Sequence, residues 1–161
     1  MAKEKSTSTT LVNELLHSKE VDWNAVLETC ITAFECATGT LHFLEPGTDL
    51  LQLKAQKGIP EFLMPKVSTI PIGKGMAGIA AERRKPVEMC NLQTDASGVA
   101  RPAAKETKME GSLAAPMIYK GTLYGTLGVA KPVSYNFTKE ESEALMAIGE
   151  RIGQYLAQGE G

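Results

Sequence analysis

The chain has 161 residues, of which 43% are hydrophobic and 22% are charged, and its formal net charge is −2. This length suits a single domain with a full hydrophobic core, so neither disulfides nor a structural metal are needed to hold it together. Because a slightly acidic chain has no general attraction for phosphate groups, we expect neither nucleic acid nor an anionic membrane as its main partner.

The cysteines and the N-terminus indicate a cellular compartment. Cys30, Cys36 and Cys90 are odd in number and lack C-x-x-C spacing, which favours reduced thiols. The N-terminus lacks the apolar segment of a signal peptide, and no apolar run approaches the ~20 residues of a membrane span. We therefore expect a cytoplasmic protein, and we expect no metal and no other cofactor.

The N-terminal residues differ in composition from the rest of the chain. Residues 1–9 are polar, small and charged, and we interpret them as a frayed tail that precedes one domain over residues 10–158. Apolar residues between positions 11 and 16 then predict a short amphipathic helical turn, which breaks off before a stronger helix.

That stronger helix has a clear start and a clear apolar face. Asp22 can cap its N-terminus, and apolar residues recur at helical spacing from Trp23 to Phe34 as one continuous stripe. Cys30 lies inside this stripe. A buried, inert thiol is therefore the simpler interpretation of Cys30, and a reactive thiol is the alternative.

A β-hairpin is predicted next. Residues 40–44 and 50–57 form its strands, and residues 45–49 form the turn between them. The two prolines in residues 59–66 predict a loop or a short helical turn, and residues 67–72 predict a short strand.

A short helix and the least regular segment of the chain follow. An alanine-rich helix is predicted from Met76 to Arg84, before Pro86 and a brief strand over residues 87–90. Residues 91–108 have no clear periodicity. Because irregular segments longer than ~12–15 residues are usually functional or mobile, this segment is a candidate functional region.

The C-terminal third predicts a second hairpin and a helix. Residues 112–119 and 122–130 flank a Lys-Gly turn, and Thr138 and Glu141 form a T-x-x-E capping box for the terminal helix. Strands thus follow one another in hairpins and do not alternate with long helices. This order indicates an α+β fold around an antiparallel sheet.

The stretch IGKGMAGIAAE over residues 72–82 contains the pattern G-x-G-x-x-G, with Asp95 downstream. A dinucleotide site needs a buried apolar strand, a long helix and a second parallel strand that ends at the acidic residue, and these are missing. We expect instead that Gly73 and Gly75 turn the chain sharply and that Gly78 lets the helix approach the sheet closely.

Several of these segments together resemble one known family. The segments that carry the resemblance are PIGKGMAGIAA (71–81), Pro86-Val87, SLAAPMIYKGTLYGTLGV (112–129) and FTKEE (137–141). This combined pattern is similar to that of GAF domains, which are small-molecule sensing modules, and the resemblance covers roughly residues 22–158. It implies a central antiparallel sheet of about six strands, with the first and last helices on one face and a ligand pocket on the other.

The resemblance also allows the subtypes of the family to be compared with this chain. Cyclic-nucleotide binders share an N-K…F-x-x-x-D-E signature, and the corresponding residues here are Ala130, Lys131, Phe137, Glu141 and Ser142. The asparagine and the final acid are absent, so cyclic-nucleotide binding is weakened. Helix capping explains the phenylalanine and the glutamate equally well.

Two further subtypes lack their reactive residues here. Bilin-binding and haem-binding members would need a cysteine or histidine in the pocket region, but His17 and His42 lie early in the chain and Cys90 has no histidine beside it. Free methionine-R-sulfoxide reductases need pocket cysteines. The matching place in the glycine turn is Ala77, and residues 91–111 contain no cysteine.

The resemblance places the pocket under the helix that follows the glycines and under the irregular segment. Arg101 is our first choice because its guanidinium can bind a carboxylate or phosphate through paired hydrogen bonds, although an exposed loop charge is the alternative interpretation. Side chains alternate between the two faces of a strand, but this alternation alone does not decide whether Tyr119 points into the pocket or into the core. The predicted ligand-binding residues are Arg101, Asp95, Lys105, Met76, Met89 and Tyr119. We expect no catalytic residue.

Three functions follow from this set of observations. The first is a sensor that binds a small molecule and passes the signal through its terminal helices, across a homodimer or to a signalling partner protein. The second is a small enzyme similar to the methionine sulfoxide reductases. The third is a structural dimerisation module with a vestigial pocket. The missing thiols favour the first and third, which are not enzymes.

Overall fold

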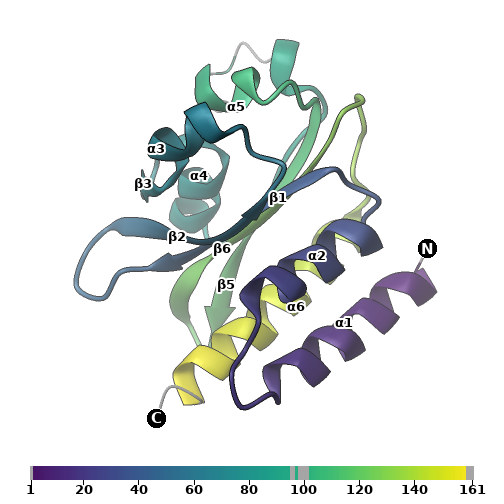
Figure 1. Cartoon of the computed structure of the whole chain (residues 1–161), viewed down its shortest axis with the longest axis vertical. Coiled ribbons are helices and arrows are strands. Elements are labelled where there is room, and N and C mark those ends of the chain that lie inside the picture. The colour runs from purple at the N-terminus through teal and green to yellow at the C-terminus, as the bar shows by residue number, and fades with distance from the viewer. Residues whose placement is uncertain (1, 95–96, 98–101, 159–161) are drawn as a thin grey trace.

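The computed structural model describes residues 2–94, 97 and 102–158, with the backbone alone described for residues 2–8, 103 and 104 (Figure 1). The helices are α1 (Ala2–Leu16), α2 (Trp23–Ala33), α3 (Met64–Val67), α4 (Gly75–Arg83), α5 (Pro102–Glu106) and α6 (Lys139–Gln158). The strands are β1 (Thr38–Leu44), β2 (Leu50–Lys57), β3 (Thr69–Pro71), β4 (Val87–Met89), β5 (Gly111–Tyr119) and β6 (Thr122–Lys131). Two short 3₁₀ turns are η1 (Glu61–Leu63) and η2 (Leu92–Thr94).

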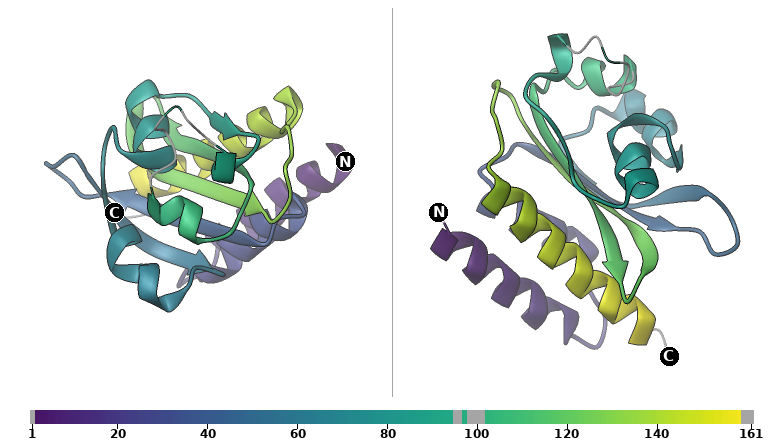
Figure 2. Two further views of the ribbon diagram at one scale, coloured as in Figure 1. Left: turned by 90° about the horizontal axis from the view of Figure 1, so that it is seen from above. Right: turned by 180° about the vertical axis from the view of Figure 1, so that it is seen from behind.

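The strands form one curled sheet of six strands in the order β3-β2-β1-β6-β5-β4, and every neighbouring pair is antiparallel. Helices α2 and α6 cover one face of this sheet, whereas α3, α4 and α5 lie over the other (Figures 1 and 2). The α+β arrangement predicted from the hairpins is confirmed. In the described part of the chain, every helix is too short or too polar to serve as a membrane span.

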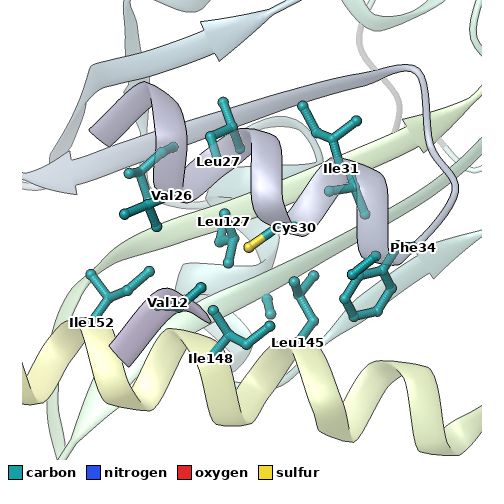
Figure 3. Close-up of a cluster of buried hydrophobic side chains, with 14 of the residues drawn as sticks. Val12, Val26, Leu27, Cys30, Ile31, Phe34, Leu127, Leu145, Ile148 and Ile152 are labelled. Atoms are coloured by element: carbon teal, nitrogen blue, oxygen red, sulfur yellow. The ribbon is translucent and has the colours of Figure 1, made fainter. Parts of the chain in front are cut away.

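The main hydrophobic core lies between the sheet and helices α2 and α6 (Figure 3). Asp22 caps α2 as predicted, because its side chain accepts a hydrogen bond from the backbone N–H of Ala25 at 3.1 Å. Cys30 is fully buried in this core beside Leu127 and Ile148, and burial raises the pKa of its thiol to about 12. The interpretation of Cys30 as an inert core residue therefore holds.

Helix α1 differs from the sequence prediction. It begins at Ala2, so residues 2–9 are helical and do not form the frayed tail that their composition suggested. Val12 and Leu16 are buried in the core that α2 and α6 share. Once these side chains dock, the preceding residues can extend the helix through backbone hydrogen bonds, because propagation costs far less than nucleation.

The glycine-rich stretch forms a corner between β3 and α4. Gly73 and Gly75 have φ angles of 94° and 67°, in the left-handed region that favours glycine. A Cβ atom at Gly78 would lie 2.4 Å from the carbonyl oxygen of Pro71, so only glycine lets α4 approach β3 this closely. Because β3 is antiparallel to β2, the parallel strands of a dinucleotide fold are absent from the described sheet.

The end of β6 holds α2 in place. Lys131 is buried, and its Nζ donates to the backbone carbonyl oxygens of Phe34 at 2.8 Å and Glu35 at 3.0 Å. The same ammonium lies 4.5 Å from the centre of the Tyr135 ring. A positive charge here satisfies the carbonyl groups at the C-terminal end of α2 and complements the helix dipole.

The predicted capping box of α6 is present. The backbone N–H of Glu141 donates to Oγ1 of Thr138 at 3.0 Å, and the backbone N–H of Thr138 donates to Oε1 of Glu141 at 2.9 Å. The hydroxyl of Tyr135 also donates to Glu141, at 2.8 Å, and this hydrogen bond is the main reason why the pKa of Tyr135 rises to about 12. Glu141 therefore has a structural role at the start of α6.

Candidate functional site

A cavity of about 640 Å³ lies on the sheet face opposite α2 and α6. Strands β1, β5 and β6 form its floor. Helix α3, strand β3 and the first turn of α4 form one part of its roof, and residues from η2, α5 and the start of the following loop form the other. The predicted pocket therefore exists on the predicted face and beneath the predicted segments.

The floor is hollow because its side chains are small. Thr40 of β1, Gly128 of β6 and Ala114 of β5 are direct neighbours across the three strands, and all three line the cavity. Thr38 and Ser112 extend this row and are themselves mostly buried. Larger residues at these positions would fill the space between the sheet and the roof.

Two polar contacts hold the roof. Nε2 of His42, which rises from β1, lies 2.8 Å from the carbonyl oxygen of Val67 at the end of α3. Lys66 of α3 forms an ion pair with Glu106 of α5 at 3.6 Å, and this pair joins the two parts of the roof. Both partners are well exposed, so the ion pair itself adds little stability.

His42 is the most deeply buried polar residue that lines the cavity, with an exposed fraction of 1%. Burial lowers its pKa below the usual value, and the hydrogen bond to Val67 only partly opposes this shift. A carbonyl oxygen can only accept, so Nε2 carries the proton and the neutral ring presents a lone pair at Nδ1. Within the described residues, Nδ1 is buried without a hydrogen-bond partner.

The N-terminus of α4 also borders the cavity. The backbone N–H groups of Gly75, Met76 and Ala77 have no hydrogen-bond partner among the described residues, and the preceding Lys74 makes no side-chain cap. Such unpaired groups and the helix dipole favour negative charge. Lys66 and Lys74 are the charged side chains of the described lining, which contains no acidic residue.

The predicted site residues are only partly brought together. Met76 lines the cavity. Lys105 lies in α5 outside the described lining, and its backbone oxygen accepts a hydrogen bond from the Gln93 side chain at 2.9 Å. Met89 lies on the edge strand β4, also outside that lining. Asp95 and Arg101 lie outside the residues that the structure describes.

Tyr119 is on the other side of the sheet. A Cβ atom at Gly153 of α6 would lie 3.3 Å from that of Tyr119, so this tyrosine packs under α6 and not in the cavity. Sequence reasoning also missed His42, Thr38 and Thr40 as lining residues. Their alternation along one strand was the available signal, but it does not show which face of the strand is hollow.

None of the three cysteines is among the described lining residues. Cys30 is buried in the core on the opposite face, and Cys36 and Cys90 are half-buried and exposed. The described lining therefore offers hydroxyl groups, one imidazole and two ammonium groups, but no thiol nucleophile.

Comparisons with known proteins agree with this geometry. The family model described as GAF domain matches residues 23–157. No curated protein sequence matches the chain.

Solved structures show the same fold at low sequence identity. The GAF domain of a phosphoenolpyruvate-protein phosphotransferase from Coxiella burnetii has 18% identity and a TM-score of 0.80, and the match covers 99% of this chain and 96% of that one. The free methionine-R-sulfoxide reductase of Neisseria meningitidis, solved with its substrate, has 16% identity and a TM-score of 0.77, covering 97% and 90%. The A. aeolicus nlh2 GAF domain in an inactive state has 14% identity and a TM-score of 0.77, covering 98% of both chains.

Proposed function

The chain belongs to the GAF domain family, and from this premise we propose that it is a sensor that binds a small molecule in the cavity between the sheet and α4. The cavity is the observation that carries this proposal. Its volume of about 640 Å³ lies within the range of about 300–1,000 Å³ that is usual for small-molecule sites. Its lining is mostly apolar with a few polar groups, which is the usual composition of such sites.

The strands under the cavity offer a route for the signal. Strand β5 contributes Ser112 and Ala114 to the cavity floor, and α6 packs against the opposite face of the same strand. A Cβ atom at Gly149 of α6 would lie 3.1 Å from the carbonyl oxygen of Pro116, so this contact is close. A ligand that shifts β5 would therefore also shift α6.

We further propose that α1 and α6 form the contact surface of a homodimer or of a signalling partner protein. The two helices lie side by side on the outside of the molecule (Figures 1 and 2), and Leu11 on α1 is 45% exposed. Sedimentation velocity of the wild type and of Leu11→Glu tests this proposal. We expect a dimer that the charged variant weakens, and a monomer at all concentrations would contradict the homodimer.

A thermal-shift screen tests ligand binding. We expect at least one compound from a panel of nucleotides, oxo-acids, aromatic acids and amino acids to raise the melting temperature in proportion to its concentration. Uniform melting temperatures across the panel would count against a sensor and favour the structural module.

The reductase is the second candidate because two of the similar structures are enzymes of that kind. The described cavity lining contains no cysteine to act as the nucleophile, so we expect no turnover of methionine sulfoxide with a thioredoxin-type reductant. Turnover that persists in a variant with all three cysteines replaced would point to a contaminating enzyme. Turnover that this variant loses would contradict our preference for a sensor.

A further inference from the structure

Four cations gather outside the cavity, where the C-terminal end of α4 meets the turn between β5 and β6. They are Arg83, Arg84, Lys85 and Lys120, and we call this group the basic tip. We propose that the basic tip binds a segment of a partner protein that is rich in aspartate and glutamate. Binding here requires no ligand in the cavity, so it is a function beyond the proposed sensor.

A hydrogen bond joins the two parts of the basic tip. The guanidinium of Arg84 donates through Nη2 to the backbone carbonyl oxygen of Gly121, so the end of α4 lies against the β5–β6 turn. Lys120 is the neighbour of Gly121 in this turn, and its ammonium lies 5.4 Å from the centre of the Tyr119 ring. Cations from two elements that are distant in sequence therefore share one surface.

The positive charges of the basic tip have no carboxylate partner in the part of the chain that the structure describes. All four residues are exposed. The lysines that form ion pairs there are Lys57, Lys66 and Lys139, none of which belongs to the tip. The preceding Glu82 lies against the glycine corner, since a Cβ atom at Gly73 would be 3.3 Å from its Oε2. This local excess of positive charge, on a chain of net charge −2, attracts anionic partners.

The backbone at two of these positions is better suited to other residues. Arg84 ends α4 with a φ angle of 59°, and Lys120 begins the two-residue β5–β6 turn with a φ angle of 50°. Glycine is favoured at such a helix end, and asparagine is favoured before glycine in such a turn. Arginine and lysine adopt this left-handed conformation only at a cost in stability. Their presence at both positions is explained if the charge itself has a function.

The surroundings of the tip favour an acidic protein segment over a membrane or a nucleic acid. Attachment to a membrane surface uses apolar side chains besides cations, but the exposed large hydrophobic residues of the described chain are Leu11, Phe62 and Val133, which lie on other elements. Nucleic acids are usually bound by an extended stripe of cations, whereas the basic tip is a small group. Arginine can bind one carboxylate through paired hydrogen bonds, and lysine can bind another.

The basic tip also adjoins the end of α6. Nε2 of Gln158 donates to the hydroxyl of Tyr119 at 3.4 Å, and the β5–β6 turn lies beside the C-terminal end of α6 (Figures 1 and 2). A partner bound at the tip would therefore lie next to the helix through which we propose that the signal passes.

Fluorescence anisotropy tests this inference with a defined probe. The probe is a fluorescein-labelled peptide of alternating glutamate and glycine, and the control peptide has glutamine in place of glutamate. We expect the acidic peptide to bind at least tenfold more tightly than the control at low salt. Added salt should weaken this binding, because it screens exposed charges. Phosphatidylserine vesicles and a random DNA duplex are the competing partners.

Matched charge reversals locate the binding surface. The double variant Lys85→Glu, Lys120→Glu leaves the hydrogen bond of Arg84 in place and should weaken binding of the acidic peptide at least tenfold. The double variant Lys19→Glu, Lys54→Glu makes the same change in net charge at two exposed lysines on other parts of the molecule. This control should weaken binding less than threefold.

One further variant separates charge from backbone fit. Lys120→Asn puts the favoured residue into the turn and removes a positive charge, so it should raise the melting temperature while it weakens peptide binding at least threefold. A lower melting temperature with unchanged binding would show that Lys120 has only a structural role.

Three other results would overturn the inference. One is equal affinity for the two peptides, or no measurable binding of either. Another is equal weakening by the two double variants. The third is tighter binding to the vesicles or to the DNA duplex than to the acidic peptide. All of these results are independent of ligand binding in the cavity, so the sensor proposal stands or fails separately.

Discussion

The two faces of the sheet are built from alternate residues of the same strands, but they serve different purposes. On β5 and β6, Leu113 and Leu127 point into the packed core, whereas their neighbours Ala114 and Gly128 line the cavity. Side chains alternate along a strand, so one sequence encodes a filled face and a hollow face at once. The comparison teaches that stability should depend on the first face and binding on the second, so mutations can separate the two.

The largest expected effect is loss of a core side chain. Leu127→Ala should lower the free energy of unfolding by about 3 kcal/mol, because Leu127 is fully buried between the sheet and α2 and α6. Thr40→Val on the cavity face keeps the side-chain shape and should change stability by less than about 1 kcal/mol. Urea denaturation measures both. Equal losses would show that the cavity face is as tightly packed as the core.

The next effect concerns the buried ammonium on the filled face. Lys131→Met removes the donor to two carbonyl groups at the end of α2 and should cost about 2 kcal/mol, because hydrogen bonds to charged groups are stronger than neutral ones. Lys139→Met, at a lysine whose side chain is 88% exposed, is the control and should stay within about 0.5 kcal/mol. A similar small change for Lys131→Met would mean that water replaces the ammonium without loss.

Within a single pH unit, a smaller effect appears in the pH dependence of stability, with one group on each face. Burial raises the pKa of Cys30 from 9.0 to about 12, so the unfolded chain loses its thiol proton first as the pH rises above 9.0. The contribution of this thiol to the free energy of unfolding is fully present below pH 9.0. Above pH 9.0 it falls by about 1.4 kcal/mol per pH unit. Cys30→Ala should flatten this slope, whereas Cys90→Ala should not.

His42 acts at the other end of the pH range. Its pKa is lowered from 6.5 by burial, so the unfolded chain takes up the proton first as the pH falls, and stability declines below about pH 6.5. His42→Gln should flatten the acid side of the stability profile, measured by urea denaturation across pH 5–7. An unchanged acid slope in this variant would contradict the burial of a neutral imidazole.

The packed face could largely be predicted from the sequence. Helical spacing located the stripe of α2, and local side-chain caps at Asp22 and Thr138 marked the starts of α2 and α6. Helix α1 could not be predicted in full, because its first residues carry no apolar signal of their own and depend on docking at Val12 and Leu16.

The cavity was located correctly as a region but not as a set of residues. Met76 was found because it follows the glycine corner directly. His42 was set aside because it lies early in the chain, but β1, which carries it, forms part of the cavity floor, so that expectation was wrong. Tyr119 occupies an alternate position of β5 with Leu113 and Met117, so it lies on the same face as these core residues. The packing of distant helices decides which face of a strand lines the cavity. The local sequence pattern does not contain this information.

The smallest expected effect on stability accompanies the most direct test of the cavity. A Cβ atom at Gly128 would meet nothing closer than Oγ1 of Thr40 at 3.5 Å, so the first carbon of a side chain fits there in ordinary van der Waals contact. Gly128→Val should therefore fold with an almost unchanged melting temperature while its methyl groups fill the cavity floor. The decisive measurement is a calorimetric titration of the wild type and Gly128→Val with the compound that gives the largest thermal shift. We expect binding to the wild type and at least hundredfold weaker binding to the variant, and equal affinity for the two proteins would contradict a ligand site in this cavity.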